Sequence, residues 1–198
     1  WVDAPSFELD GERRDHFAYL VFVLSMCLVP LAANTMTFVI AWELMSLASY
    51  FLVLHDRESK ASIYAGWVYA VMTHAGLACL LAGMLLLGTW TGSPRFVDWH
   101  ATAPALSGAA RNAVFVLLGL GFAGKAGVIP LHVWLPLAHP AAPSHVSALM
   151  SGVMIKLGVY GLLRVTFDWL GAGPTWWGGA LLLAGAASAL IGVLYALV

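Results

Sequence analysis

Long apolar stretches separated by short polar segments make up most of the chain. Residues 16–54 contain a single Asp, Glu, Lys or Arg side chain, Glu43. One helix over that stretch would be about 58 Å long, whereas about 20 apolar residues suffice to cross the hydrocarbon core of a bilayer. We therefore expect two membrane-spanning helices, 16–34 and 36–54, with a hinge near Asn34.

The apolar stretches after these two predict four further helices. Polar residues 55–60 indicate a loop, and the segment 89–110 has the tryptophans, charges and turn residues typical of a membrane interface. The pattern predicts an all-α, polytopic transmembrane helix bundle that forms a single domain over 1–198. Its six expected helices are 16–34, 36–54, 61–88, 111–138, 141–164 and 176–198.

Composition supports a membrane protein. Hydrophobic residues make up 61% of the chain and charged residues 10%, whereas soluble domains are about 45–50% apolar and about 25% charged. This excludes a water-soluble enzyme. The net charge of −1 offers no basic patch for nucleic acid. Cys27 and Cys79 lie in apolar runs, and no His/Cys spacing predicts a metal site. Because the chain starts at Trp1 and stops inside an apolar run, we expect a fragment of a longer protein.

Three charged residues lie within the predicted helices, away from the polar segments: Glu43, Lys125 and Lys156. A lysine at the centre of a membrane helix costs about 2.5–3.5 kcal/mol, so such groups line a water path or pair with each other. A structural ion pair would account for Glu43 and one lysine. Two lysines and one glutamate do not neutralise fully, so we expect these side chains to transfer protons.

The surroundings of Lys125 predict a break in the helix 111–138. Four glycines lie within residues 119–127, and Pro130 follows them. Glycine and proline both weaken helices, so we expect the interruption from Gly124 through Gly127 to Pro130.

A broken helix at membrane depth is tolerated only where it is buried in protein or lines a cavity. Secondary transporters build their ion sites from such discontinuous helices. The alternative is that the glycines only form a packing surface between helices.

Two histidines extend the candidate set. His145 and Lys156 are eleven residues apart, which in a regular α-helix leaves them about 20° from one another, on one face. His74 lies midway along a predicted helix and titrates near neutral pH. Alternatively, His145 only sits at the interface and His74 only packs in the core. A pair of histidines would also ligate a haem, but His16, His55 and His100 lie at segment ends.

Two stretches resemble a known family. Residues 42–50, WELMSLASY, are similar to a signature of the antiporter-like proton-translocating subunits found in respiratory NADH:quinone oxidoreductase, Mrp-type antiporters and membrane-bound hydrogenases. Residues 124–161 resemble the central block of that family. In detail they resemble most the branch of hydrogenase-4 component B and formate hydrogenlyase subunit 3, because Leu137 stands where the respiratory enzyme usually has Asp.

The resemblance implies both a fold and roles for residues. The chain would be the first half of an inverted-repeat transporter fold. Glu43, Lys125 and Lys156 match the family's proton-transfer positions, and His74 fits a relay position. No cofactor is expected in this chain, whereas partner subunits would carry Fe–S clusters and Ni–Fe or flavin.

The implied function is proton translocation in the cell inner (plasma) membrane, with several membrane passes. The chain would be a non-redox subunit that couples electron transfer in hydrophilic partner subunits to proton transport, next to other membrane-arm subunits. It would perform no catalytic chemistry itself. One alternative is a subunit of a multi-subunit sodium/proton antiporter. The other is a structural membrane scaffold in which the charges only pair.

Overall fold

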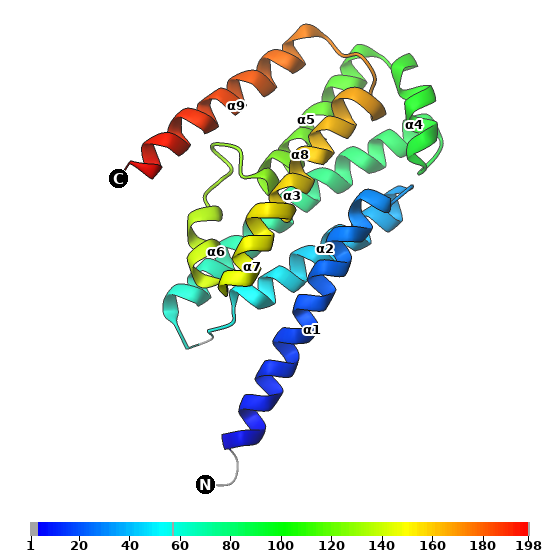
Figure 1. Cartoon of the computed structure of the whole chain (residues 1–198). Helices are drawn as coiled ribbons and strands as arrows, with labels where there is room; N and C mark the ends of the chain where they lie inside the picture. Colours follow the sequence, from blue (N-terminus) through cyan, green and yellow to red (C-terminus); the bar gives the residue numbers. More distant parts are fainter. Residues whose placement is uncertain (1–3, 57, 198) are drawn as a thin grey trace.

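A computed structural model describes residues 4–56 and 58–197. Within these ranges the chain is helical, and the sole β-type pairing is an isolated bridge between Asn34 and Arg95. The helices are α1 (Ala4–Leu31), α2 (Thr35–Val53), α3 (Lys60–Thr91), α4 (Phe96–Thr102), α5 (Gly108–Ala126), α6 (Leu135–Ala141), α7 (Ser144–Leu149), α8 (Ile155–Leu163) and α9 (Thr175–Ala196) (Figure 1).

Short turns of other helix types complete the architecture. A 3₁₀ turn, Ala103–Ala105, follows α4. Two π-helical turns, Met150–Met154 and Arg164–Trp169, flank α8. Together with α7 they form one continuous helix, Ser144–Trp169. Figure 1 shows α3, α5 and this helix at the centre of the bundle, with α1 and α9 at its edges.

Within residues 4–56 and 58–197, five helices are long and apolar enough to cross a membrane, whereas we expected six. They are Arg13–Leu31, Thr35–Val53, Lys60–Thr91, Ser144–Trp169 and Thr175–Tyr195. The expected helix without a counterpart among these five is 111–138. It consists of α5 and α6 with turns at 127–134 between them. The chain is thus a multi-pass membrane protein.

Several helix ends differ from the expected ones, because hydropathy marks the membrane span and not the end of the helix. Helix α1 begins at Ala4, so its polar first turns precede the apolar span. Segment 89–110, expected as a loop, contains α4. The last expected helix begins at Thr175, and its final residue, Val198, lies outside the described residues.

The turn between α1 and α2 falls near Asn34, where the sequence predicts a hinge. The Asn34 side chain accepts a hydrogen bond from the backbone N–H of Thr37 at 3.0 Å and caps α2. The backbone N–H of Thr35 donates to the carbonyl of Pro94, and that of Phe96 donates to Ala33. These bonds fasten the α1–α2 turn to the start of α4.

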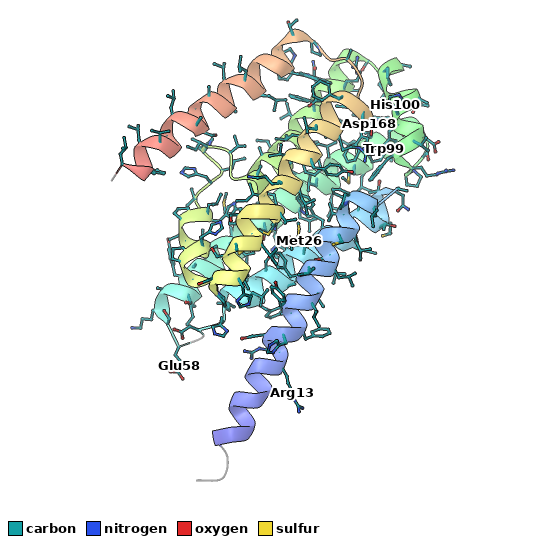
Figure 2. The ribbon with its side chains drawn as sticks, viewed as in Figure 1. Arg13, Met26, Glu58, Trp99, His100 and Asp168 are labelled. Atoms are coloured by element: carbon teal, nitrogen blue, oxygen red, sulfur yellow. The ribbon has the colours of Figure 1, made fainter. Side chains whose placement is uncertain are left out.

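Aromatic packing fixes the opposite end of α4. Trp99 is fully buried and contacts the ring of Trp169 at 5.4 Å between centroids. His100 and Asp168, labelled beside it in Figure 2, approach to 3.1 Å between Nδ1 and Oδ1. The α4 segment therefore closes one end of the bundle against the π-helical turn after α8.

Glycine allows α5 and α8 to approach closely. A Cβ added at Gly158 would lie 2.6 Å from the backbone nitrogen of Ala126 and 2.8 Å from the carbonyl oxygen of Phe122. At Gly161 it would collide with the Phe122 ring. The end of α5, which carries Lys125, is thus held against α8 by backbone contact.

This contact predicts the effect of one methyl group. Gly158→Ala should destabilise the full-length protein by about 1–3 kcal/mol, because two backbones must separate to admit it. Gly152→Ala is the control on the same continuous helix, since an added Cβ there meets nothing within 4 Å. Thermal unfolding in detergent compares them, and equal unfolding temperatures for both variants would contradict the close approach.

Candidate proton-transfer site

Lys125 lies in the last turn of α5, where the helix stops. Gly127 follows the helix with φ of +70°, a left-handed conformation that glycine adopts without strain. Its N–H and that of Val128 bond back to carbonyls in the last turn. The indole Nε1 of Trp134 donates to the carbonyl oxygen of Gly124 at 2.9 Å. The helix thus ends with its carbonyls paired, inside the expected break.

Hydroxyl groups from two other helices surround the Lys125 amine, which is 4% exposed. Its Nζ donates to Ser46 Oγ on α2 at 3.0 Å and to the Tyr69 hydroxyl on α3 at 2.9 Å. Ser49 Oγ lies 2.6 Å from the same Tyr69 oxygen. All three hydroxyl-bearing residues are buried. We call Ser46, Ser49 and Tyr69 the hydroxyl cage.

Glu43 contacts a histidine and not the buried lysine. Its Oε1 lies 3.2 Å from His74 Nε2, which joins α2 to α3. Glu43 is three residues before Ser46 on α2, and Ser46 is the residue whose hydroxyl accepts a hydrogen bond from Lys125. In the described part of the chain, no carboxylate oxygen lies within 4.0 Å of the Lys125 amine. Among the described residues, Glu43 and Lys125 therefore form no direct ion pair.

The geometry of His74 requires a shared proton. Its Nδ1 lies 2.8 Å from the carbonyl oxygen of Ala70. A carbonyl only accepts, so Nδ1 carries a hydrogen and a neutral ring has its lone pair on Nε2. That lone pair faces a carboxylate oxygen. A hydrogen bond between Nε2 and Glu43 thus needs one further proton, on either residue.

Lys156 and His145 lie apart from this cluster. Both are exposed. The His145 ring packs edge-on against Tyr19 of α1, with centroids 5.2 Å apart. The expectation that they share a face assumed a regular α-helix. The π-helical turn Met150–Met154 lies between them, and one inserted residue rotates Lys156 by about 100° relative to His145.

The hydroxyl cage was missed at the level of sequence. Ser46 and Ser49, three residues apart in an apolar helix, share a face, which was an available signal. Tyr69 carried no comparable signal, because its partner is on a different helix. In the described ranges 4–56 and 58–197, no group of three His, Cys, Asp or Glu side chains gathers to hold a metal ion.

Comparison with known proteins places this geometry in a family. The family described as NADH:quinone oxidoreductase/Mrp antiporter, transmembrane, matches residues 32–198. The chain belongs to this family. Its members thus include both redox-linked subunits and antiporter subunits.

Two relatives and one solved structure give the scale of the likeness. An uncharacterized protein of Mycobacterium tuberculosis is 48% identical over 93% of this chain and 29% of its own length. Hydrogenase-4 component B of Escherichia coli K12 is 45% identical over 96% of this chain and 28% of its own length.

A chain of respiratory complex I from Thermus thermophilus, with bound aureothin, superposes with a TM-score of 0.74. It is 25% identical and covers 93% of this chain and 39% of that one. The present chain therefore spans less than a third of the length of the two relatives.

The shared proton predicts energetic coupling between two side chains. Glu43→Gln and His74→Gln should each destabilise the full-length protein, and the double variant should be no worse than either. The expected coupling is about 1 kcal/mol. A cycle of thermal unfolding in detergent measures it, with His74→Gln combined with Asp98→Asn as the control pair. Asp98 bonds to Ser93 and shares no partner with His74. Additive effects of Glu43 and His74 would contradict the pairing.

Proposed function

We propose that this chain is part of a proton-translocating subunit of a multi-subunit membrane oxidoreductase, of the hydrogenase-4/formate hydrogenlyase or NADH:quinone oxidoreductase type. The subunit transports protons while partner subunits transfer electrons. The observation that carries the proposal is a buried amine, Lys125, at a broken helix end, with the Glu43–His74 pair one turn of α2 away from its hydrogen-bond partner Ser46. Family membership and the likeness to hydrogenase-4 component B support the class of complex.

The protonation of the Glu43–His74 pair and the protonation of Lys125 oppose each other electrostatically. Without its shared proton the Glu43–His74 pair carries one negative charge, and this charge favours the ammonium form of Lys125. With the shared proton the pair is neutral and this support is lost. A proton that reaches the pair therefore promotes release of the proton from Lys125. The coupling acts across one turn of α2, through which Glu43 and the Lys125 partner Ser46 are linked.

Lys156 receives the released proton in this proposal. It lies two residues after Met154, whose sulfur lies 3.6 Å from the Tyr69 hydroxyl oxygen. The π-helical turn that contains Met154 thus connects the hydroxyl cage to the segment of α8 that carries Lys156. His145, on α7 against Tyr19 of α1, is a further proton-transfer residue in this proposal. No redox group is assigned to these residues, and the Fe–S clusters with Ni–Fe or flavin belong to partner subunits.

A sodium/proton antiporter subunit is the second candidate, because the family description covers the Mrp antiporter. The two differ in their partners. Purification of the full-length protein with a nickel–iron hydrogenase or an NADH-oxidising module supports the first function. Purification with small antiporter subunits, and sodium-dependent proton transport without a redox substrate, supports the second.

Replacement of the lysines tests the transport role. Lys125→Ala and Lys156→Ala should each reduce proton uptake at least ten-fold in proteoliposomes that hold the whole complex. Lys156→Arg should also impair uptake, because arginine does not release its proton. Electron transfer between the soluble substrates of the partner modules serves as the reference activity.

Lys60→Ala is the matched control, since Lys60 is an exposed lysine at the start of α3, outside the candidate site. Normal uptake by both Lys125→Ala and Lys156→Ala would refute the transport role. It would leave the scaffold alternative, in which the charges only stabilise the bundle.

A further inference from the structure

The hydrogen bonds of the hydroxyl cage all run in one sense, from the Lys125 amine as donor toward backbone carbonyls of α2 as final acceptors. We propose that Ser46 and Tyr69 are positioning residues that stabilise the protonated form of Lys125, and that their hydroxyl chains end on the backbone of α2 and do not conduct the proton. This inference rests on the proposed function, because it concerns how the transport site holds its proton.

The Ser46 branch ends after one bond. Ser46 Oγ donates its single hydrogen to the carbonyl oxygen of Trp42 at 3.0 Å. Its lone pairs are then free to accept from Lys125 Nζ. A backbone carbonyl does not take up a proton and pass it on. Ser46 therefore solvates the ammonium group and gives the proton no onward path.

The Tyr69 branch ends in the same way. Ser49 Oγ lies 2.7 Å from the carbonyl oxygen of Met45 and 3.0 Å from that of Ser46, so its one hydrogen points into α2. The contact of 2.6 Å between Ser49 and Tyr69 then has Tyr69 as the donor. The Met154 sulfur, 3.6 Å from the Tyr69 oxygen, is the more distant and weaker acceptor for that hydrogen. Because Tyr69 has one hydrogen, its oxygen accepts from Lys125. This chain runs from the amine through two hydroxyls to a carbonyl.

Such an arrangement distinguishes the two forms of Lys125. An ammonium group has three hydrogens and needs acceptors, and the cage supplies two. A neutral amine has a lone pair that needs a donor, but both hydroxyl hydrogens are already committed to α2. The cage thus favours the protonated form, in a pocket where burial alone would favour the neutral one.

Other titratable groups near the amine are few. Glu43 on α2 is the charged group that acts on Lys125, and Tyr69 on α3 is its titratable hydrogen-bond partner. Lys156, on the packed helix α8, is exposed. The centroid of the Tyr69 ring lies 5.2 Å from Nζ, so the amine is at the hydroxyl end of the side chain. Replacement of Tyr69 by Phe keeps the ring and removes the hydroxyl alone.

The test is the pH dependence of proton uptake in proteoliposomes that hold the whole complex. Tyr69→Phe and Ser46→Ala should each weaken proton binding by Lys125 about ten-fold. The alkaline limb of the profile of uptake against pH, where uptake falls as pH rises, should therefore move about one pH unit lower. Ser49→Ala should move it less in the same direction, because Ser49 does not touch the amine. Ser46→Thr retains the hydroxyl and should restore the original limb.

Two further variants control for the loss of any buried hydroxyl. Thr73 bonds only to carbonyls of α3, and Ser25 bonds to the carbonyl of Phe22 on α1. Thr73→Val and Ser25→Ala should leave the alkaline limb in place. Co-purification with the partner subunits shows that each variant has folded and assembled.

Two results would overturn the inference. If Tyr69→Phe and Ser49→Ala abolish uptake at every pH in assembled complexes, the hydroxyl chain conducts the proton. If the cage variants keep the original profile while Lys125→Ala abolishes uptake, the cage has no role but the transport function stands. Normal uptake by Lys125→Ala would instead refute the proposed function itself.

Discussion

Hydrogen bonds from one buried amine join three helices at the centre of this bundle. Lys125, at the end of α5, donates to Ser46 on α2 and to Tyr69 on α3. A buried ammonium group without partners costs several kcal/mol, so α2 and α3 must present their hydroxyls where α5 ends. The helix must also end there, because the left-handed Gly127 turns the chain away beside the amine. The polar contact thus determines how α2 and α3 pack against the end of α5, and Gly127 determines where α5 ends.

The fourth side of the site depends on backbone contact. Helix α8 lies against the end of α5 because Gly158 has no Cβ to hold the two apart. This contact brings Met154, in the π-helical turn before α8, to the Tyr69 hydroxyl. A π turn is frequent at functional sites, since it places one extra residue on the inner face. The same turn lies between His145 and Lys156, so the regular helical spacing that would place them on one face does not apply.

The sequence predicted those parts of the structure that depend on local signals. Asn34 caps a helix through its own side chain, and Gly127 ends one through its own backbone, so both breaks were visible in the order of residues. The pairing of Lys125 with Tyr69 was not, because it links positions 56 residues apart on helices whose relative rotation the apolar pattern leaves open. The π-helical turn before Lys156 was not visible either, because hydropathy does not distinguish a π turn from an α turn.

The Glu43–His74 pair and the Lys125 amine differ in how much of each side chain is exposed. The side chains of His74 and Glu43 are 54% and 26% exposed, whereas Lys125 is 4% exposed. The pair is therefore less enclosed by the described part of the chain than the amine is. In the proposed function, each proton gained by the pair removes the charge that holds the proton on Lys125. The hydroxyl cage opposes that loss, so it determines how complete the neutralisation of Glu43 must be before Lys125 lets its proton go.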